Sequence, residues 1–173
     1  MQELERTYLA KEFPADLKSF PWKELLDIYV PSTSEHPGLR IRKRGDVYEI
    51  TKKRPVADGD ASHQTEDTIL LSPEEYAELS QLGGKRVGKT RYYYKDGGVD
   101  YEIDIFTGDL SGLVLVDVEF GSIEEKDAFT APSFCLAEVT HELFVAGGMI
   151  CGKTYADIEK DLARFNYAQL SVS

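Results

Sequence analysis

The chain has 173 residues, enough for one sizeable core and too few for two domains of ordinary size. Its hydrophobic fraction of 42% and charged fraction of 29% are those of a globular protein and exclude wholesale disorder. The net charge of -11 argues against nucleic acid as a general partner. We therefore expect one domain spanning residues 1–173.

Cysteine content and hydropathy point to an intracellular protein. Two cysteines are too few for a disulfide framework, and they form no Cys-x-x-Cys pair. No apolar stretch approaches the ~20 residues that a membrane span needs. Residues 1–5 lack the basic region and apolar run of a signal peptide. We expect a cytoplasmic location and no membrane contact.

Short segments with strand composition dominate the chain. They cover residues 3–11, 24–30, 39–44, 47–54, 65–71, 86–95, 99–107 and 112–120. Turn signals at Arg44-Gly45-Asp46 and at Lys95-Asp96-Gly97-Gly98 join neighbouring strands as hairpins. Eight strands with short antiparallel connections predict a sandwich or a barrel.

Helices are expected at only a few places. Ser72-Pro73-Glu74-Glu75 is a capping box with proline at the first helical position, so a helix should run to about Leu82. A second helix should begin at Thr154, and its apolar stripe is formed by Tyr155, Ile158, Leu162 and Phe165. This stripe needs a partner surface, which we expect to be the outside of the sheet. Residues 56–64 have loop composition.

Same-sign charges recur two residues apart on several strands. Such residues point to one face, where like charges repel by roughly 2 kcal/mol at an effective dielectric of about 20. A single pair is more typical of a solvated face, but five pairs on different strands need a common explanation. The pairs are Glu3 and Glu5, Arg40 and Arg42, Lys89 and Arg91, Glu102 and Asp104, and Asp117 and Glu119.

The apolar neighbours of these charges favour an interior location. Ile103 and Ile105 alternate with Glu102 and Asp104, so an apolar face backs the charged one. If the apolar faces pack against helices, the charged faces can close on each other as a barrel lumen. Carboxylates around a divalent cation, and Arg or Lys around phosphate oxygens, would offset the cost of burying those charges. The pattern predicts a mainly β (α+β) fold, a closed eight-stranded antiparallel barrel with a few helices packed outside.

Seven short motifs follow one another along nearly the whole chain. They are Glu3-Leu4-Glu5-Arg6-Thr7, Leu39-Arg40-Ile41-Arg42, Ile50-Thr51-Lys52-Lys53, Lys89-Thr90-Arg91-Tyr92, Tyr101-Glu102-Ile103-Asp104-Ile105-Phe106, Gly112 to Glu119, and Glu138-Val139-Thr140. In this order and spacing they resemble the motifs of the CYTH domain family, the triphosphate tunnel metalloenzymes. That family includes inorganic triphosphatases, thiamine triphosphatases and class IV adenylate cyclases.

The resemblance implies a triphosphate in the tunnel and Mg²⁺ or Mn²⁺ as cofactor. It implies metal binding by Glu3, Glu5 and Glu119, with Asp117, Glu102, Asp104 and Glu66 as further ligands. It implies that phosphate oxygens are bound by Arg40, Arg42, Lys53, Lys89 and Arg91. The implied catalytic set is Glu5, Glu119, Lys53 and Arg91. One metal would neutralise the triphosphate while a second positions an attacking water or hydroxyl.

The chain departs from the family pattern in three places. The lysine that closes the N-terminal signature is Thr7 here, which supplies no positive charge near the carboxylates. Where the family has an arginine ahead of the acidic residue of the fifth strand, this chain offers His63 or Gln64. The segment after Thr140 lacks the family's usual ending.

Two other features have simpler interpretations. Residues 147–154 fit the phosphate-binding pattern Gly-x4-Gly-Lys-Thr, but the chain lacks the alternating strands and helices of a parallel sheet. We interpret them as a turn that ends in a helix N-cap. His36, His63 and His141 share no ligand spacing and are interpreted as surface or loop residues.

Three functional hypotheses follow. The first is a metal-dependent hydrolase that cleaves the terminal phosphate of inorganic triphosphate or a related organic triphosphate. The second is a class IV-type adenylate cyclase that converts ATP to cyclic AMP in the same tunnel. The third, motivated by Thr7, is a non-catalytic polyphosphate or nucleotide binder. Pairing of outer surfaces as a homodimer is compatible with all three.

Overall fold

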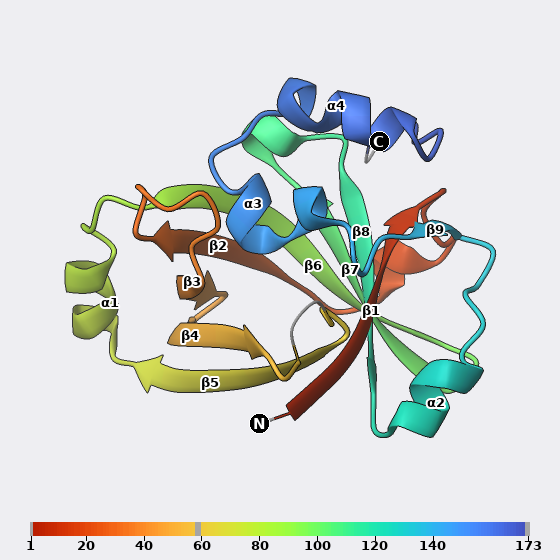
Figure 1. Cartoon of the computed structure of the whole chain (residues 1–173), viewed down its shortest axis with the longest axis horizontal. Coiled ribbons are helices and arrows are strands. Elements are labelled where there is room, and N and C mark those ends of the chain that lie inside the picture. Colours follow the sequence, from red (N-terminus) through yellow and green to blue (C-terminus); the bar gives the residue numbers. More distant parts are fainter. Residues whose placement is uncertain (1, 58–59, 172–173) are drawn as a thin grey trace.

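The computed structural model describes residues 2–57 and 60–171, and its main element is one antiparallel sheet (Figure 1). The strands are β1 (Gln2–Ala10), β2 (Trp22–Val30), β3 (Leu39–Arg44), β4 (Val47–Pro55), β5 (His63–Leu71), β6 (Lys85–Asp96), β7 (Val99–Phe106), β8 (Val114–Phe120) and β9 (Cys135–Glu138). The α-helices are α1 (Pro73–Leu79), α2 (Ile123–Ala128), α3 (Gly147–Ile150) and α4 (Tyr155–Ala163). Short 3-10 helices are η1 (Leu17–Ser19), η2 (Gly108–Leu110) and η3 (Leu143–Val145).

The sheet closes on itself as an eight-stranded barrel. Its strand order is β5-β4-β3-β2-β6-β7-β8-β1, and β1 pairs again with β5 through Gln2 opposite Thr65 and Leu4 opposite His63. The predicted barrel is therefore confirmed, and closure leaves its strands without an exposed edge at this seam. β9 adds to β1 outside the ring, with Tyr8 opposite Glu138. Sequence reasoning missed β9 because four residues are too few to show an alternating pattern.

The predicted turns and caps are present at both hairpins and at both predicted helices. Gly45 between β3 and β4, and Gly97 and Gly98 between β6 and β7, adopt positive φ angles of 60°, 56° and 82°. Ser72 and Glu75 form the capping box of α1, which ends at Leu79 instead of Leu82. The predicted loop 56–64 is two residues too long because β5 begins at His63; residues 58–59 of it lie outside the described residues.

The apolar sides of β7 and β8 are buried outside the barrel. Ile103, Val116 and Val118 pack with Phe134 and with Leu17 of η1 in one cluster. This cover is a 3-10 helix and irregular chain, where the sequence pattern suggested helices. Glu102 and Asp104 nevertheless point into the barrel, as predicted, because they lie on the opposite face of β7 from its buried apolar side chains.

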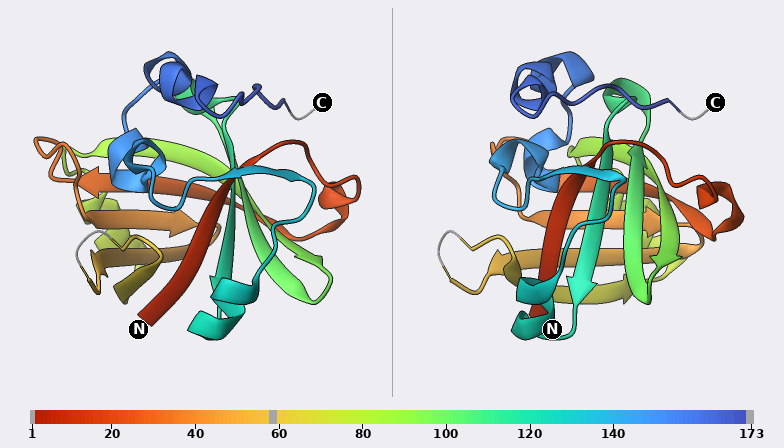
Figure 2. Two further views of the ribbon diagram at one scale, coloured as in Figure 1. Left: turned by 45° about the vertical axis from the view of Figure 1, so that its right-hand side comes forward. Right: turned by 90° about the vertical axis from the view of Figure 1, so that its right-hand side faces the viewer.

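The predicted stripe of α4 is buried, but not against the outside of the sheet as expected: it packs at one end of the barrel, on the inward faces of the strands. Tyr29, Val87 and Leu115 belong to the same cluster and also line the lumen cavity. Ile158 and Leu162 are fully buried with Leu113 and Phe144, while Tyr155 and Phe165 are partly buried at the edge of the same cluster. Figure 2 shows α3 and α4 together at one end of β8 and α2 at the other. None of the helices in residues 2–57 and 60–171 is long and apolar enough to cross a membrane.

Residues 147–154 form the single turn of α3 followed by Thr154, the N-cap of α4. A Cβ atom on Gly148 would lie only 2.5 Å from both Cδ2 of His36 and the carbonyl oxygen of Pro37. The glycine therefore permits close contact between α3 and the β2–β3 connection. Because the sheet is antiparallel, the interpretation of this segment as a turn and a cap holds, and a phosphate-binding loop is excluded.

Candidate active site in the barrel lumen

The lumen contains a cavity of about 1330 Å³ whose wall carries many charged side chains. All twelve residues proposed from the sequence line it. They are Glu3, Glu5, Arg40, Arg42, Lys53, Glu66, Lys89, Arg91, Glu102, Asp104, Asp117 and Glu119. Acids and bases that are distant in sequence therefore meet around one space instead of facing solvent.

One wall holds a buried ion pair between β2 and β3. Arg42 donates from Nε to Asp27 Oδ1 at 2.6 Å and from Nη2 to Asp27 Oδ2 at 2.7 Å. Burial alone would raise the pKa of Asp27, but the Arg42 guanidinium lowers that pKa to about 2. Sequence reasoning missed Asp27. The available signal was a single acid inside the apolar run of residues 25–30.

A second wall holds two cations on one carboxylate. Arg91 donates from Nε to Asp104 Oδ1 at 2.7 Å and from Nη2 to Asp104 Oδ2 at 2.6 Å, and Lys89 also donates to Asp104. Asp104 is completely buried. Although burial favours its neutral form, Arg91 and Lys89 hold the pKa of Asp104 below its usual range. Burial lowers the pKa of Lys89, and Asp104 opposes that shift.

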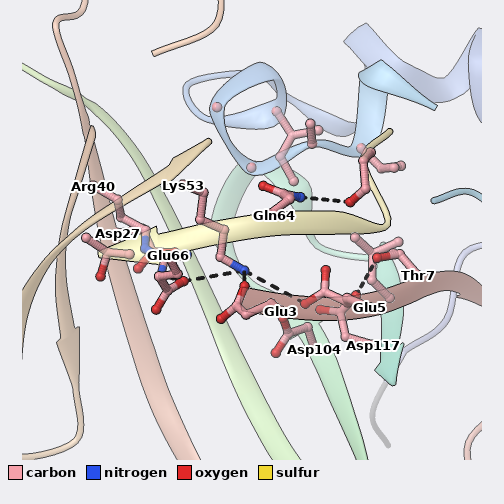
Figure 3. Close-up of a pocket in the computed structure, with 18 of the residues that line it drawn as sticks. Glu3, Glu5, Thr7, Asp27, Arg40, Lys53, Gln64, Glu66, Asp104 and Asp117 are labelled. Carbon is pink, nitrogen blue, oxygen red and sulfur yellow. Dashed lines mark hydrogen bonds and ion pairs between the residues drawn. The ribbon is translucent and has the colours of Figure 1, made fainter. Parts of the chain in front are cut away.

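Lys53 occupies the space between three glutamates (Figure 3). Its Nζ lies 2.6 Å from Glu3 Oε2, 3.4 Å from Glu66 Oε2 and 3.8 Å from Glu5 Oε2. Burial opposes the charged form of Lys53, but Glu5 and Glu3 raise its pKa above the ordinary value. Arg40 completes this group, with Nη2 at 3.8 Å from Glu66 Oε2.

A third group consists of carboxylates with too few cations nearby. Glu5 and Glu119 stand opposite each other on β1 and β8, and Asp117 follows opposite Thr7. Burial, then the charges of Glu5 and Asp104, raise the pKa of Asp117 to about 7. Burial is also the first cause of the raised pKa of Glu5 and of Glu119. A hard divalent cation would relieve this repulsion, and carboxylate oxygens are the kind of ligand that such a cation prefers.

The acids are nevertheless dispersed by the cations between them. In the part of the chain that the structure describes, no three His, Cys, Asp or Glu side chains are grouped closely enough to hold a metal ion. Lys53 separates Glu66 from Glu5, and Arg91 bonds Glu102 as well as Asp104. The structure thus places the seven proposed metal ligands around one lumen, while the metal-binding role of each stays a prediction.

Of the positions that depart from the family pattern, Thr7 and Gln64 line the lumen. His63 does not, and it is the first residue of β5 instead of a loop residue as expected. The Thr7 hydroxyl donates to Asp117 Oδ1 at 2.7 Å, where the family has an ammonium group (Figure 3). Gln64 lines the cavity, but its Nε2 donates to the carbonyl of Ala61 at 2.9 Å. His36 and His141 lie in loops as expected, yet both line the cavity.

A closed barrel with acids and bases on its inner wall defines this protein as one of the tunnel class. No family model matches the chain. Over 146 residues the chain is 36% identical to an inorganic triphosphatase from Nitrosomonas europaea. This match covers 82% of this chain and 91% of that protein. A crystal structure of an inorganic triphosphatase superposes with a TM-score of 0.64 at 29% identity, covering 87% of this chain and 95% of that one.

A more distant structure from Bacillus halodurans, whose name suggests an adenylate cyclase, gives a TM-score of 0.54 at 13% identity and covers 99% of this chain and 93% of that one. At this identity the likeness concerns the fold alone. The relative from Nitrosomonas and the tunnel architecture together establish the family. The chain belongs to the CYTH, or triphosphate tunnel metalloenzyme, family.

Proposed function

We propose that this protein hydrolyses inorganic triphosphate or a related organic triphosphate, with Mg²⁺ or Mn²⁺ as cofactor. The observation that carries the proposal is the convergence of the five proposed cationic side chains and the seven proposed carboxylates on a single lumen. The inorganic triphosphatase from Nitrosomonas, at 36% identity, supports the same reaction. A polyanion and a divalent cation together supply the counter-charges that such a lumen needs.

The cations form the phosphate-binding half of the site. Arg42 and Arg91 are fixed by buried carboxylates, and Arg40, Lys53 and Lys89 add charge from the same lumen. Guanidinium groups match the geometry of phosphate oxygens and remain charged at every working pH. Together these five side chains bind and orient the triphosphate so that its terminal phosphorus faces the carboxylates of β1 and β8.

The carboxylates form the metal-binding half. Glu3, Glu5 and Glu119 would hold the metal, with Asp117, Glu102, Asp104 and Glu66 as further ligands. A bound metal supplies charge neutralisation and a Lewis acid at the phosphate oxygens. Water adds to the terminal phosphorus, the phosphoanhydride P–O bond breaks, and orthophosphate and pyrophosphate are the products. Glu5, Glu119, Lys53 and Arg91 form the proposed catalytic set.

Tripolyphosphate turnover tests the proposal. Purified protein with Mg²⁺ or Mn²⁺ should release phosphate from tripolyphosphate, and Glu119→Gln should reduce the rate by about a hundredfold or more. Glu124→Gln, an exposed acid on α2, serves as the matched control and should retain the wild-type rate. If tripolyphosphate, nucleoside triphosphates and thiamine triphosphate all remain intact, the hydrolase proposal is wrong.

One observation favours a second candidate, a non-catalytic binder. A hydroxyl at Thr7 donates to Asp117 in place of the family's ammonium group. A binder would show a higher melting temperature with tripolyphosphate and no product. Formation of cyclic AMP from ATP without free phosphate would instead identify the cyclase that the sequence left open. The cytoplasmic location, the homodimer and the single domain over residues 1–173 stay predictions.

A further inference from the structure

Asp27 and Arg42 form a buried ion pair in the wall of the lumen, joined by two hydrogen bonds. The two residues stand directly opposite each other on β2 and β3. Their side chains are 2% and 6% exposed, and two hydrogen bonds of 2.6 and 2.7 Å join them. Both line the cavity that we propose for the triphosphate.

Neither stability nor charge explains an acid at this position. A buried ion pair is often no more stable than apolar residues of similar volume, because desolvation offsets the attraction. Asp27 also cancels the charge of Arg42, one of the cations that line the lumen, which weakens the attraction of the lumen for a polyanion. Since apolar residues in place of the pair would serve stability as well, and the charge of Asp27 opposes polyanion binding, its contribution must be sought in geometry.

The geometry of the bonds suggests what that contribution is. Asp27 accepts hydrogen bonds from Nε and Nη2 of Arg42, which fixes the guanidinium plane and leaves Nη1 outside the pair. Asp104 accepts bonds from the same two nitrogens of Arg91. Arg40 shows the contrast, because its buried Nε has no hydrogen-bond partner among the residues that the structure describes. An arginine held in this way loses little side-chain freedom when it binds phosphate.

We infer that Asp27 is a positioning residue that holds Arg42 in the orientation required for binding the triphosphate. It acts only through Arg42 and does not bind substrate or metal. The inference rests on the proposed function, since it assigns a role within the same site. No sequence motif assigned a role to this residue.

The direction in which Asp27→Asn changes the Kd for tripolyphosphate distinguishes a positioning role from a simple charge effect. The substitution removes one negative charge from the lumen, so a pure charge effect would make tripolyphosphate bind more tightly. Loss of positioning predicts the opposite, an increase in Kd and KM of about tenfold to a hundredfold with a smaller change in kcat, by analogy with the residues that hold metal ligands in place by hydrogen bonds. Isothermal titration calorimetry with tripolyphosphate and steady-state kinetics measure both quantities.

Glu49→Gln is the matched control. Glu49 is another buried lumen acid, but it pairs with Arg44, which has no proposed role in phosphate binding. Its neutralisation should leave the Kd for tripolyphosphate unchanged or slightly lower. An unchanged or lower Kd for Asp27→Asn, or an equal weakening by Glu49→Gln, would overturn the inference.

A double-mutant comparison tests whether Asp27 acts through Arg42. In an Arg42→Met background, adding Asp27→Asn should not weaken tripolyphosphate binding further. If the single variants do not fold, the double variant, which leaves no unpaired buried charge, is compared directly with wild type, and a Kd for tripolyphosphate no higher than that of wild type would refute the role of the pair in binding. Further weakening in that background would contradict the inference. Wild-type turnover reports on the proposed function separately: an active wild type with additive variants refutes the positioning role alone, and a wild type that neither binds nor cleaves tripolyphosphate refutes both.

Discussion

Asp27 and Asp117 are buried carboxylates in the same lumen, yet their pKa values move in opposite directions. Asp27 has Arg42 as its partner and its pKa falls to about 2. Burial, together with the negative charges of Glu5 and Asp104, raises the pKa of Asp117 to about 7. The partner of each carboxylate, more than its depth, therefore decides whether it is a fixed anion or a group that needs a cation.

The depressed pKa of Asp27 predicts acid sensitivity. Its pKa is about 2 in the folded protein against an ordinary 3.8, so its stabilisation is complete above pH 3.8 and is lost as the pH falls through about 2. The shift corresponds to about 2 kcal/mol at pH 7. Urea unfolding should show Asp27→Asn less stable than wild type at pH 7, with the difference shrinking between pH 4 and pH 2. A difference that stays constant over this interval would contradict the assignment.

Thr7→Lys should increase the rate of tripolyphosphate hydrolysis. An ammonium group in place of the Thr7 hydroxyl would lie close to Asp117, which now accepts that hydroxyl's hydrogen bond at 2.7 Å. The added charge stabilises ionised carboxylates and a developing negative charge, and we expect a gain of about tenfold in kcat. Thr7→Gln, which adds length without charge, is the control. Equal rates for the two variants would exclude an electrostatic role for position 7.

Among the elements, α4 shows how sequence pattern and tertiary contact combine. Its apolar residues recur at helical spacing, and Thr154 caps it through a hydrogen bond from Thr154 N to Asp157 Oδ2 at 2.8 Å. The pattern predicts an amphipathic helix but leaves its partner open. That partner is the cluster of Leu113, Phe144 and their neighbours, which exists only when η2, η3 and α4 meet at one end of the barrel.

Leu162→Ala tests the contribution of α4 to stability. Leu162 is 1% exposed, and truncating such a side chain leaves a cavity that costs about 2–5 kcal/mol. Urea unfolding should show a loss of this size, while Glu159→Ala on the exposed face of α4 should change stability by less than about 0.5 kcal/mol. A change as small for Leu162→Ala as for Glu159→Ala would show that the packing of Leu162 contributes little to stability.

For the whole molecule, closure of the sheet is the decisive event. Pairing of β1 with β5 brings Glu3 and Glu5 of β1 next to Lys53 of β4, which is distant from them in sequence. Until this seam forms, the acids of β1 and the cations of β3 and β4 lie on separate parts of the sheet. The site is thus a property of the closed barrel and of no single hairpin.

Metal and triphosphate should therefore stabilise the closed barrel. A ligand that binds only the folded state raises its stability by RT ln(1 + [L]/Kd), about 2.7 kcal/mol at a hundredfold excess over Kd. Thermal unfolding should show a higher Tm with Mn²⁺ or Mg²⁺ plus tripolyphosphate, and excess chelator should reverse the metal-dependent part. Glu119→Gln should reduce the metal-dependent shift, whereas Glu124→Gln should preserve it. A Tm independent of metal in wild type would contradict metal binding in the lumen.

Most charged residues of the site were predictable because strands impose a period of two, whereas Lys53 and Glu66 were assigned only through the resemblance to the family. Five same-sign pairs at that spacing marked the inner faces of β1, β3, β6, β7 and β8 before any coordinates were considered. Asp27 has no partner of this kind on β2, so periodicity could not mark it. Its partner Arg42 is fifteen residues away and lies opposite it only through the β2–β3 register.

The amino-acid sequence by itself determined the eight strands of the barrel, the two main helix starts and the inward direction of the charges, since these depend on local periodicity and turn chemistry. Only the tertiary structure decided which charges pair. Lys53 meets three glutamates, Asp104 is shared by two cations, and Asp27 holds Arg42. Which side chains form ion pairs depends on distances of a few ångströms between strands. Those distances follow from strand register and barrel closure, which no local sequence pattern encodes.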